Sequence, residues 1–186
     1  MKVMLQLLVS REVRVGDCSP HRGFIRPVCT SNVRVLEDVI RPSLAAIKNK
    51  LDEAEISIEL QGFDQLPVVW VDPAAIQQVV FNLLMNAVNY SPRKSIIKLS
   101  ATTSKDAFKI RFINQTVAGI HPEETERIFE MGFRGAEASR KEPSGLGAGL
   151  YVVRNLLMAH GGDVSVKFDK NLFETTINLP LKQELE

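Results

Sequence analysis

The stretch DPAAIQQVVFNLLMNAVNYSP, residues 72–92, decides the fold prediction for this chain. Asp72 is a favourable N-cap and Pro73 suits the first helical position, so a helix is predicted from Asp72 to about Tyr90. A Ser-Pro pair ends it, because the residue before proline disfavours helical geometry. Apolar residues recur at i, i+3, i+4 and i+7, which predicts a stripe packed on a core. The stripe consists of Ile76, Val79, Val80, Leu83, Leu84, Ala87 and Val88.

A second set of side chains on this helix is polar. It comprises Gln78, Asn82, Asn86 and Asn89, spaced three or four residues apart on a different side. Asparagine is a poor helix former, because its amide competes for backbone hydrogen bonds. An uncharged oxygen on a rigid helix can ligate a hydrated Mg²⁺ that also binds phosphates. The alternative is a solvated helix face that happens to use asparagine, and the helix alone leaves both interpretations open.

A glycine-rich segment, GLGAGL at residues 145–150, leads directly into another predicted helix. Alternate glycines let backbone N–H groups approach phosphate oxygens, and a helix N-terminus favours the negative charge. No GK[ST] follows, so the segment is not a P-loop, and no strand leads into it as in a dinucleotide fingerprint. A flexible turn before a helix is the alternative.

The remaining elements alternate between helices and strands. Helices are predicted at about 33–51, at about 122–129 and directly after the glycine-rich segment 145–150, the last one ending at the His-Gly-Gly of 160–162. Strands are predicted at 56–60, 68–71, 96–102, 108–113, 164–168 and 173–179. This mixed order indicates a two-layer α/β sandwich.

Composition limits the function classes. The chain has 186 residues, 45% of them hydrophobic, and a net charge of +1, which argues against a broad basic surface for nucleic acid or anionic lipid. No run of about 18 apolar residues is present, so no membrane-spanning segment is expected. The two cysteines form no CxxC pair, so neither a zinc site nor a disulfide framework is expected. A cytoplasmic location is predicted, although a parent protein could be membrane-anchored.

Four ordered segments resemble one family. VVFNLLMNAVNYSP (79–92) resembles an N box, IHPEETERIFEMGFRG (120–135) resembles the end of a G1 box plus an F box, and residues 145–150 resemble a G2 box, with Gly161-Gly162 closing the next helix. Residues 33–180 thereby resemble the histidine-kinase-type ATPase domain, the Bergerat fold, and the F box favours the sensor kinases. The resemblance implies a mixed, mostly antiparallel sheet with helices on one face. It also implies an ATP-binding catalytic domain at 33–183, after a linker or the end of a helical region at 1–32.

The resemblance further implies ATP and Mg²⁺ as cofactors, with Asn86 as the metal ligand. The other implied nucleotide contacts come from the N box, the G1 box, the lid at 133–144 and the G2 box: Asn82, Asn89, Tyr90, Gln115, Val117, Gly119, Arg134, Arg140, Lys141, Gly145, Gly147, Gly149 and Leu150. Three positions depart from the family pattern. Gln115 stands for the G1 aspartate that accepts the adenine amino group, Val117 stands for the first G1 glycine, and Asn89 stands for the usual N-box lysine.

The implied function is the ATP-binding domain of a sensor histidine kinase. Its partners would be a histidine-bearing dimerisation domain outside this sequence and, through the full-length protein, a response regulator. His21, His121 and His160 lie in contexts unlike the family's phosphoacceptor, and no catalytic residue is assigned. A degenerate regulatory or partner-binding module is the alternative function, and a topoisomerase- or chaperone-type ATPase is a weaker third. The lid is predicted to be mobile without nucleotide.

Overall fold

The computed structural model describes residues 18–19, 28–64, 66–117, 124–135 and 146–181. Five strands form its main sheet in the order β4-β6-β7-β9-β8. Their bounds are Ser57–Gln61 (β4), Ile96–Thr103 (β6), Ala107–Gln115 (β7), Asp163–Asp169 (β8) and Leu172–Pro180 (β9). β4 runs parallel to β6, and the other three pairs are antiparallel, which confirms the predicted mixed, mostly antiparallel sheet.

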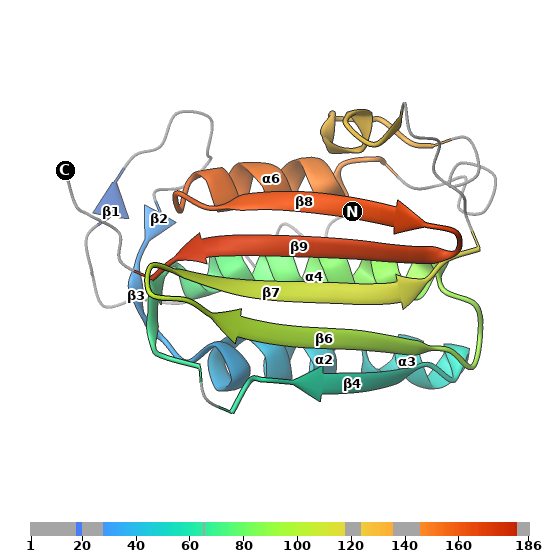
Figure 1. Cartoon of the computed structure of the whole chain (residues 1–186), viewed down its shortest axis with the longest axis horizontal. Helices are drawn as coiled ribbons and strands as arrows, with labels where there is room; N and C mark the ends of the chain where they lie inside the picture. The colour runs from blue at the N-terminus through green and yellow to red at the C-terminus, as the bar shows by residue number, and fades with distance from the viewer. Residues whose placement is uncertain (1–17, 20–27, 65, 118–123, 136–145, 182–186) are drawn as a thin grey trace.

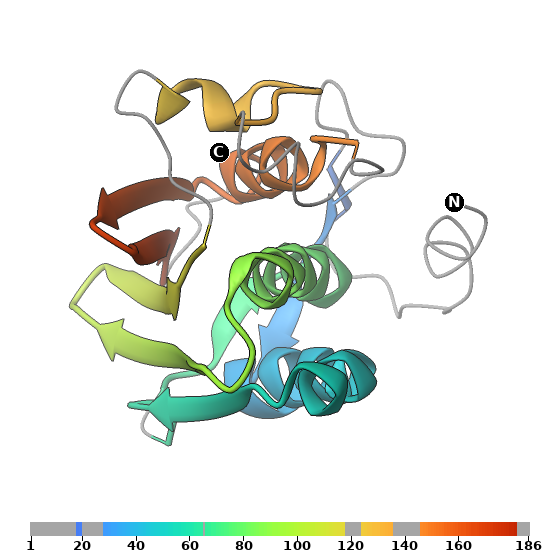
Figure 2. The same cartoon turned by 90° about the vertical axis from the view of Figure 1, so that its right-hand side faces the viewer.

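The helices lie on one face of this sheet, as Figures 1 and 2 show from two directions. They are the π-helix η1 (Val35–Ile40), α2 (Arg41–Ala46), α3 (Lys48–Ala54), α4 (Pro73–Tyr90), the 3-10 turn η3 (Arg127–Phe129) and α6 (Gly149–Met158). α4 lies behind the middle of the sheet, between the α2–α3 pair and α6. The predicted two-layer sandwich is therefore confirmed.

The core lies between α4 and the sheet. Alternate residues of β7 are buried, with Phe108, Ile110 and Phe112 on the helix side, as the period of two requires. All seven residues of the apolar stripe on α4 are buried. Each fully buried large apolar side chain contributes about 1.5–3 kcal/mol, so this contact supplies much of the stability.

The predicted helix at 33–51 is wrong at its start. Val33 lies in a strand, β3 (Ser31–Val33), which pairs antiparallel with β5 (Val69–Val71). Val33 is buried opposite Val69, so a long-range pairing overrides the local helical pattern. β3 itself begins two residues before residue 33, at Ser31.

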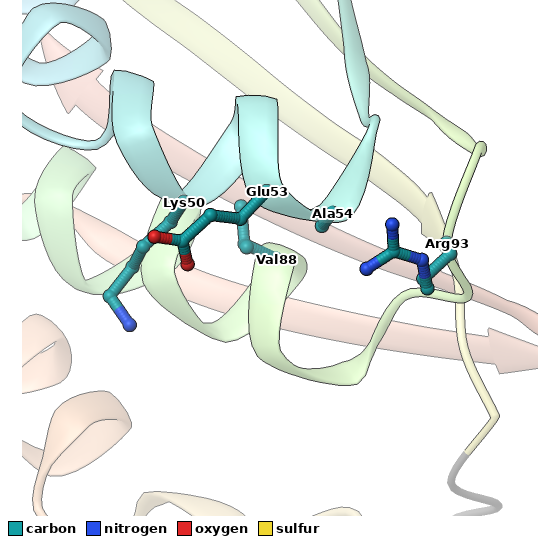
Figure 3. A pocket seen from close by; sticks show the side chains of 5 residues that line it. All are labelled: Lys50, Glu53, Ala54, Val88 and Arg93. Atoms are coloured by element: carbon teal, nitrogen blue, oxygen red, sulfur yellow. The ribbon is translucent and has the colours of Figure 1, made fainter.

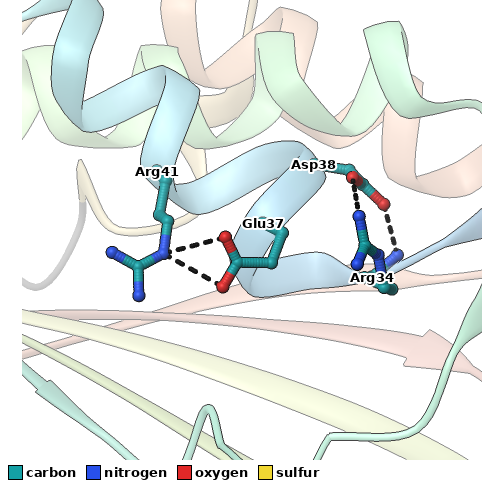
Figure 4. Close-up of polar contacts among 4 residues, drawn as sticks. All are labelled: Arg34, Glu37, Asp38 and Arg41. Carbon is teal, nitrogen blue, oxygen red and sulfur yellow. Dashed lines mark hydrogen bonds and ion pairs between the residues drawn. The ribbon is translucent and has the colours of Figure 1, made fainter.

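The rest of that predicted helix is present, but it is divided into η1, α2 and α3. Pro42 sits in the first turn of α2 and has no N–H to donate, which explains why regular α-helix starts only there. Figure 4 shows two i,i+4 ion pairs across η1, Arg34–Asp38 at 3.4 Å and Arg41–Glu37 at 3.0 Å. Such exposed pairs contribute only about 0.3–0.5 kcal/mol each.

A short antiparallel pair precedes the domain, β1 (Cys18–Ser19) with β2 (Val28–Cys29). Cys18 and Cys29 are Cα partners across this pair, and Cys29 is disulfide-bonded. The expectation of no disulfide is therefore wrong at Cys29. The spacing of the two cysteines could not reveal it, because strand pairing brings these positions together.

Candidate functional site

The first turn of α4 is firmly anchored. The Asp72 carboxylate is 2% exposed and accepts the backbone N–H groups of Ala74 at 3.0 Å and Ala75 at 3.1 Å, which confirms the predicted N-cap. Its second oxygen accepts the Cys29 N–H at 3.1 Å. The N-terminus of α4 is thus tied to β2, a segment 43 residues earlier in the chain.

His160 connects α4 to α6. It is fully buried, and its Nε2 accepts the Asp72 backbone N–H at 3.1 Å. Its Nδ1 lies 2.7 Å from the Leu156 carbonyl oxygen, so Nδ1 carries the proton and donates it. The ring is neutral in this arrangement, and both nitrogens hold backbone groups. His160 has a structural role that the sequence did not predict.

The other end of α6 meets the asparagines of α4. A Cβ added to Gly149, the first residue of α6, would lie 3.6 Å from Oδ1 of Asn86. The N-box amide therefore lies against the helix turn that follows the G2 glycines. A helix N-terminus attracts anions through its free N–H groups, and an amide oxygen can ligate a cation. These two groups lie side by side.

The polar side of α4 is not a solvated face. Asn82 is 7% exposed, while Gln78, Asn86 and Asn89 are half-buried, as are Tyr90 and Leu150. α6 packs against α4, and its first residue lies beside Asn86. The alternative interpretation, a solvated helix face that happens to use asparagine, does not fit this burial.

The G2 and F-box segments touch through their backbones. The Gly132 N–H donates to the Gly147 carbonyl at 3.2 Å, and Gly147 has a φ of +64°. A Cβ on Gly147 would lie 2.7 Å from the Phe133 carbonyl oxygen and 2.9 Å from Cγ of Arg134. Gly147 is therefore required by this packing, whatever it contributes to phosphate binding.

Two cation–π contacts support the F box. The Arg127 guanidinium lies 4.5 Å from the Phe133 ring centre, and Arg154 of α6 lies 5.7 Å from the Phe129 ring centre. These contacts connect the 3-10 turn to α6 and to the start of the lid. The predicted helix at 122–129 is present only as this turn within the described residues.

The segment after β7 is tied to the end of α4. Ser91 Oγ donates to the Gln115 carbonyl at 3.0 Å, and the Val117 N–H donates to the Tyr90 carbonyl at 3.0 Å. Gln115 itself is exposed, and its neighbour Asn114 is 4% exposed. Asn114 follows the buried series of β7 in phase, so it lies on the helix side of the sheet.

Several predicted contacts lie outside the described residues: Gly119, Arg140, Lys141 and Gly145. Most of the lid, including residues 136–144, lies there too, so its predicted mobility stays a prediction. Arg134 is described and half-buried beside Gly147. Val117 is described and 53% exposed.

Two surface depressions among the described residues lie elsewhere. One lies between α3 and the end of α4, where Lys50, Glu53, Ala54, Val88 and Arg93 surround it (Figure 3). The Arg93 guanidinium pairs with Glu55 at 2.8 Å, so its charge is partly neutralised. A second depression lies on the uncovered sheet face, over β4, β6 and β7. Neither contains a predicted nucleotide contact.

The described parts of the chain hold no cluster of three or more His, Cys, Asp or Glu side chains suited to a metal ion. A divalent cation at Asn86 would therefore take most of its oxygens from water and from the ligand that it accompanies. None of the helices in the described ranges combines the length and the hydropathy that a bilayer crossing requires.

Comparison with known proteins places this geometry in a family. Residues 71–183 match the family described as histidine kinase-, DNA gyrase B- and HSP90-like ATPases, and these residues include α4, β7, α6 and the closing strands. The chain belongs to this family. The match starts at the β5–α4 junction, where the N-box helix begins, and it runs through the last strand of the main sheet.

Relatives within the family are sensor kinases. Hik2, a sensor histidine kinase of Thermosynechococcus vestitus, is 33% identical over 127 residues, which are 68% of this chain and 32% of Hik2. The sensor-like histidine kinase SenX3 of Mycobacterium tuberculosis is 29% identical over 131 residues, 70% of this chain and 32% of SenX3. The chain therefore spans about a third of the length of these relatives.

Solved structures share the fold. The nucleotide-free catalytic domain of histidine kinase ThkA aligns with a TM-score of 0.71 at 22% identity, covering 82% of this chain and 97% of that domain. Full-length ShkA in complex with AMPPNP aligns with a TM-score of 0.70 at 22% identity, covering 84% of this chain and 32% of ShkA. Family, fold class and relatives agree with the resemblance derived from the sequence.

Proposed function

We propose that this chain is the ATP-binding domain of a sensor histidine kinase, which binds Mg-ATP and delivers the γ-phosphoryl group to a histidine on a separate dimerisation domain. The observation that carries the proposal is the contact between the Asn86 amide and the first turn of α6, 3.6 Å from the Cβ position of Gly149. It joins an oxygen ligand for a cation to a helix N-terminus suited to phosphate.

The residues fit a magnesium–phosphate ligand. Asn86 supplies one neutral oxygen, which suits an ion that keeps several waters and is held largely by phosphates. Asn82 is buried one turn earlier on the same helix and would help to hold the phosphates or the metal. The backbone at Gly147 and Gly149 would face phosphate oxygens. When bound, Mg²⁺ neutralises phosphate charge, and the protein contributes position and orientation. Arg134 lies beside Gly147 and would add a cation at the lid.

The partners follow from the same reaction. The acceptor histidine would belong to a dimerisation domain, because the one described histidine, His160, is fully buried and bonded at both nitrogens. A response regulator would then take the phosphoryl group; the related kinase ThkA has been solved in complex with the response regulator TrrA. We expect the domain to act in the cytoplasm, where ATP is supplied.

Calorimetric titration of the whole chain tests the proposal. ATP should bind with Mg²⁺ and bind much more weakly with EDTA, and Asn86→Ala should weaken Mg-ATP binding at least about tenfold. Asn49→Ala, at an exposed asparagine of α3, is the matched control and should bind as the wild type does. Equal affinities for all three proteins would refute the role of Asn86.

A second candidate is a regulatory module of the same fold that has lost ATP turnover. Asn89 in place of a lysine favours it, because a phosphate partner with a full charge is missing. Mixing the chain with a dimerisation domain from a related kinase and radiolabelled ATP distinguishes the two functions. Acid-labile label on that domain supports the kinase, while ATP binding without transfer supports the module.

A further inference from the structure

A covalent bond holds the short strand pair at the start of the described chain. β1 and β2 have two residues each, and a two-stranded hairpin is at best marginally stable in water. Cys29 of β2 is disulfide-bonded, and Cys18, its Cα partner on β1, is the only other cysteine of the sequence. The disulfide therefore joins these two strands and keeps them together as long as it is intact.

The cap of α4 receives a hydrogen bond from β2. The Cys29 N–H donates to Oδ2 of Asp72 at 3.1 Å, while Oδ1 of the same carboxylate accepts the N–H groups of Ala74 and Ala75. Asp72 is only 2% exposed, so water cannot readily replace a lost partner. Hydrogen bonds to charged groups are also stronger than neutral ones. A displacement of Cys29 therefore acts directly on the carboxylate that starts α4.

Strand pairing explains why Cys29 and Asp72 meet. Ser31 of β3 stands opposite Val71 of β5. Cys29 lies two residues before Ser31, and Thr30 between them is buried. Asp72 directly follows Val71 and begins the path into α4. The disulfide is thus attached to the strand pair from which α4 starts.

The proposed function places this disulfide in a reducing compartment. Dithiol proteins and glutathione keep cytosolic thiols reduced, and the disulfides that form there are usually transient and redox-sensing. Cys29 is half-buried and not enclosed, and exposed disulfides are the labile, regulatory ones. A dithiol would supply two electrons and two protons: the S–S bond breaks, Cys18 and Cys29 become thiols, and the dithiol becomes a disulfide.

We propose that this disulfide is a redox switch on the nucleotide site: reduction by a dithiol releases β1 from β2, frees the Cys29 N–H from Asp72 and loosens the start of α4, which lowers the affinity for Mg-ATP. The inference rests on the proposed nucleotide site, because Asn86 lies on α4 and its place beside Gly149 follows from how that helix is held. The effect is reciprocal: bound ATP must disfavour reduction by the same factor by which reduction weakens ATP binding.

The test compares the whole chain in its oxidised and reduced forms. Calorimetry in excess Mg²⁺ should show ATP binding at least about fivefold weaker in dithiothreitol, at the low end of couplings between sites because Asp72 keeps its other contacts. Hydrogen exchange at the amides of Ala74 and Ala75 should be about tenfold faster in the reduced form, since a hydrogen bond to a charged group is lost. In a dithiothreitol redox buffer, saturating Mg-ATP should shift the thiol–disulfide equilibrium toward the disulfide by the factor that calorimetry gives.

Two variants separate the switch from a general effect of the reductant. The double variant Cys18→Ser, Cys29→Ser should bind ATP as the reduced wild type does, with or without dithiothreitol. Asp72→Asn keeps a capping oxygen for α4, but one amide oxygen cannot serve both α4 and Cys29, so its ATP affinity should respond less to reduction.

The outcomes are distinct. Equal ATP affinity of the oxidised and reduced wild type would overturn the inference while ATP binding stands, and so would a chain whose cysteines stay thiols in an oxidising buffer. A response of Asp72→Asn as large as that of the wild type would overturn the route through Asp72. Absence of ATP binding by both forms would overturn the proposed function and the switch with it.

Discussion

Gly132 and Gly147 form a matched pair for testing how the lid is attached. Both have positive φ, +80° and +64°, so alanine is strained at either position. They differ in their surroundings: a Cβ on Gly132 meets nothing within 4 Å, whereas a Cβ on Gly147 lies 2.7 Å from the Phe133 carbonyl oxygen and 2.8 Å from the Gly132 carbonyl carbon. The two Ala substitutions therefore separate backbone strain from steric exclusion.

The magnitudes follow from these contacts. Gly132→Ala should cost about 1 kcal/mol, because a left-handed alanine costs about 1–2 kcal/mol and the less flexible unfolded chain offsets part of it. Gly147→Ala carries the same strain and also presses on backbone, which cannot rotate away as a side chain can. Overpacking of this kind adds about 1–3 kcal/mol, so the total should be about 2–4 kcal/mol.

Native-state hydrogen exchange at the amide of residue 132 measures this difference, since that N–H donates to the Gly147 carbonyl. Exchange should accelerate strongly in Gly147→Ala and only modestly in Gly132→Ala, and Mg-ATP affinity should fall in the same order. Equal exchange rates in the two variants would show that the G2 and F-box segments are not packed as described, and the reasoning would fail.

The remaining predictions concern the buried hydrogen bonds of His160 and Asp72 and the histidine that accepts the phosphoryl group. His160→Ala should lower the free energy of unfolding by about 2–4 kcal/mol in urea titrations, because the Asp72 N–H and the Leu156 carbonyl lose their partner beside a new cavity; a loss below about 1 kcal/mol would contradict this. Asp72→Ala should cost about 1–2 kcal/mol as a lost N-cap, and Asp72→Ser should recover part of it; an equal cost for both variants would argue against capping. The chain alone, incubated with labelled ATP, should form no acid-labile phosphohistidine; label on His21 would refute the need for a separate acceptor domain.

Local signals were sufficient for most of the fold. The N-cap at Asp72 and the stripe from Ile76 to Val88 gave α4, and alternation gave the strands of the main sheet, because each signal depends on residues close in sequence. β3 was missed because its partner β5 lies almost 40 residues away. The disulfide at Cys29 escaped prediction for the same reason, since only strand pairing shows what lies opposite.

The fold brings together two residues that the sequence predicted for the site, and their roles stay predictions. Asn86 and Gly149 lie together because each sits at a fixed point of a helix whose phase the sequence shows. At the end of β7, counting back from the G1 glycines gives Gln115, which is exposed, whereas the buried series of the strand ends with Asn114. A shift of one residue reverses the face of a side chain in a strand, so the motif spacing does not show on which face a residue lies. The role of Gln115 stays a prediction.

α4 and α6 run antiparallel, and the altered motif positions lie away from the contacts between them. The start of α6 lies beside Asn86, and His160, just after the end of α6, accepts a hydrogen bond from the start of α4, so the two helices meet at both ends. The motif departures at Asn89 and Val117 lie outside these anchoring contacts, on half-buried or exposed positions. Substitution at these positions changes the side chains that a ligand would contact. It does not remove the contacts between α4 and α6. Nucleotide affinity can therefore vary independently of the fold, which is why phosphoryl transfer, and not stability, decides between an active kinase domain and a regulatory module.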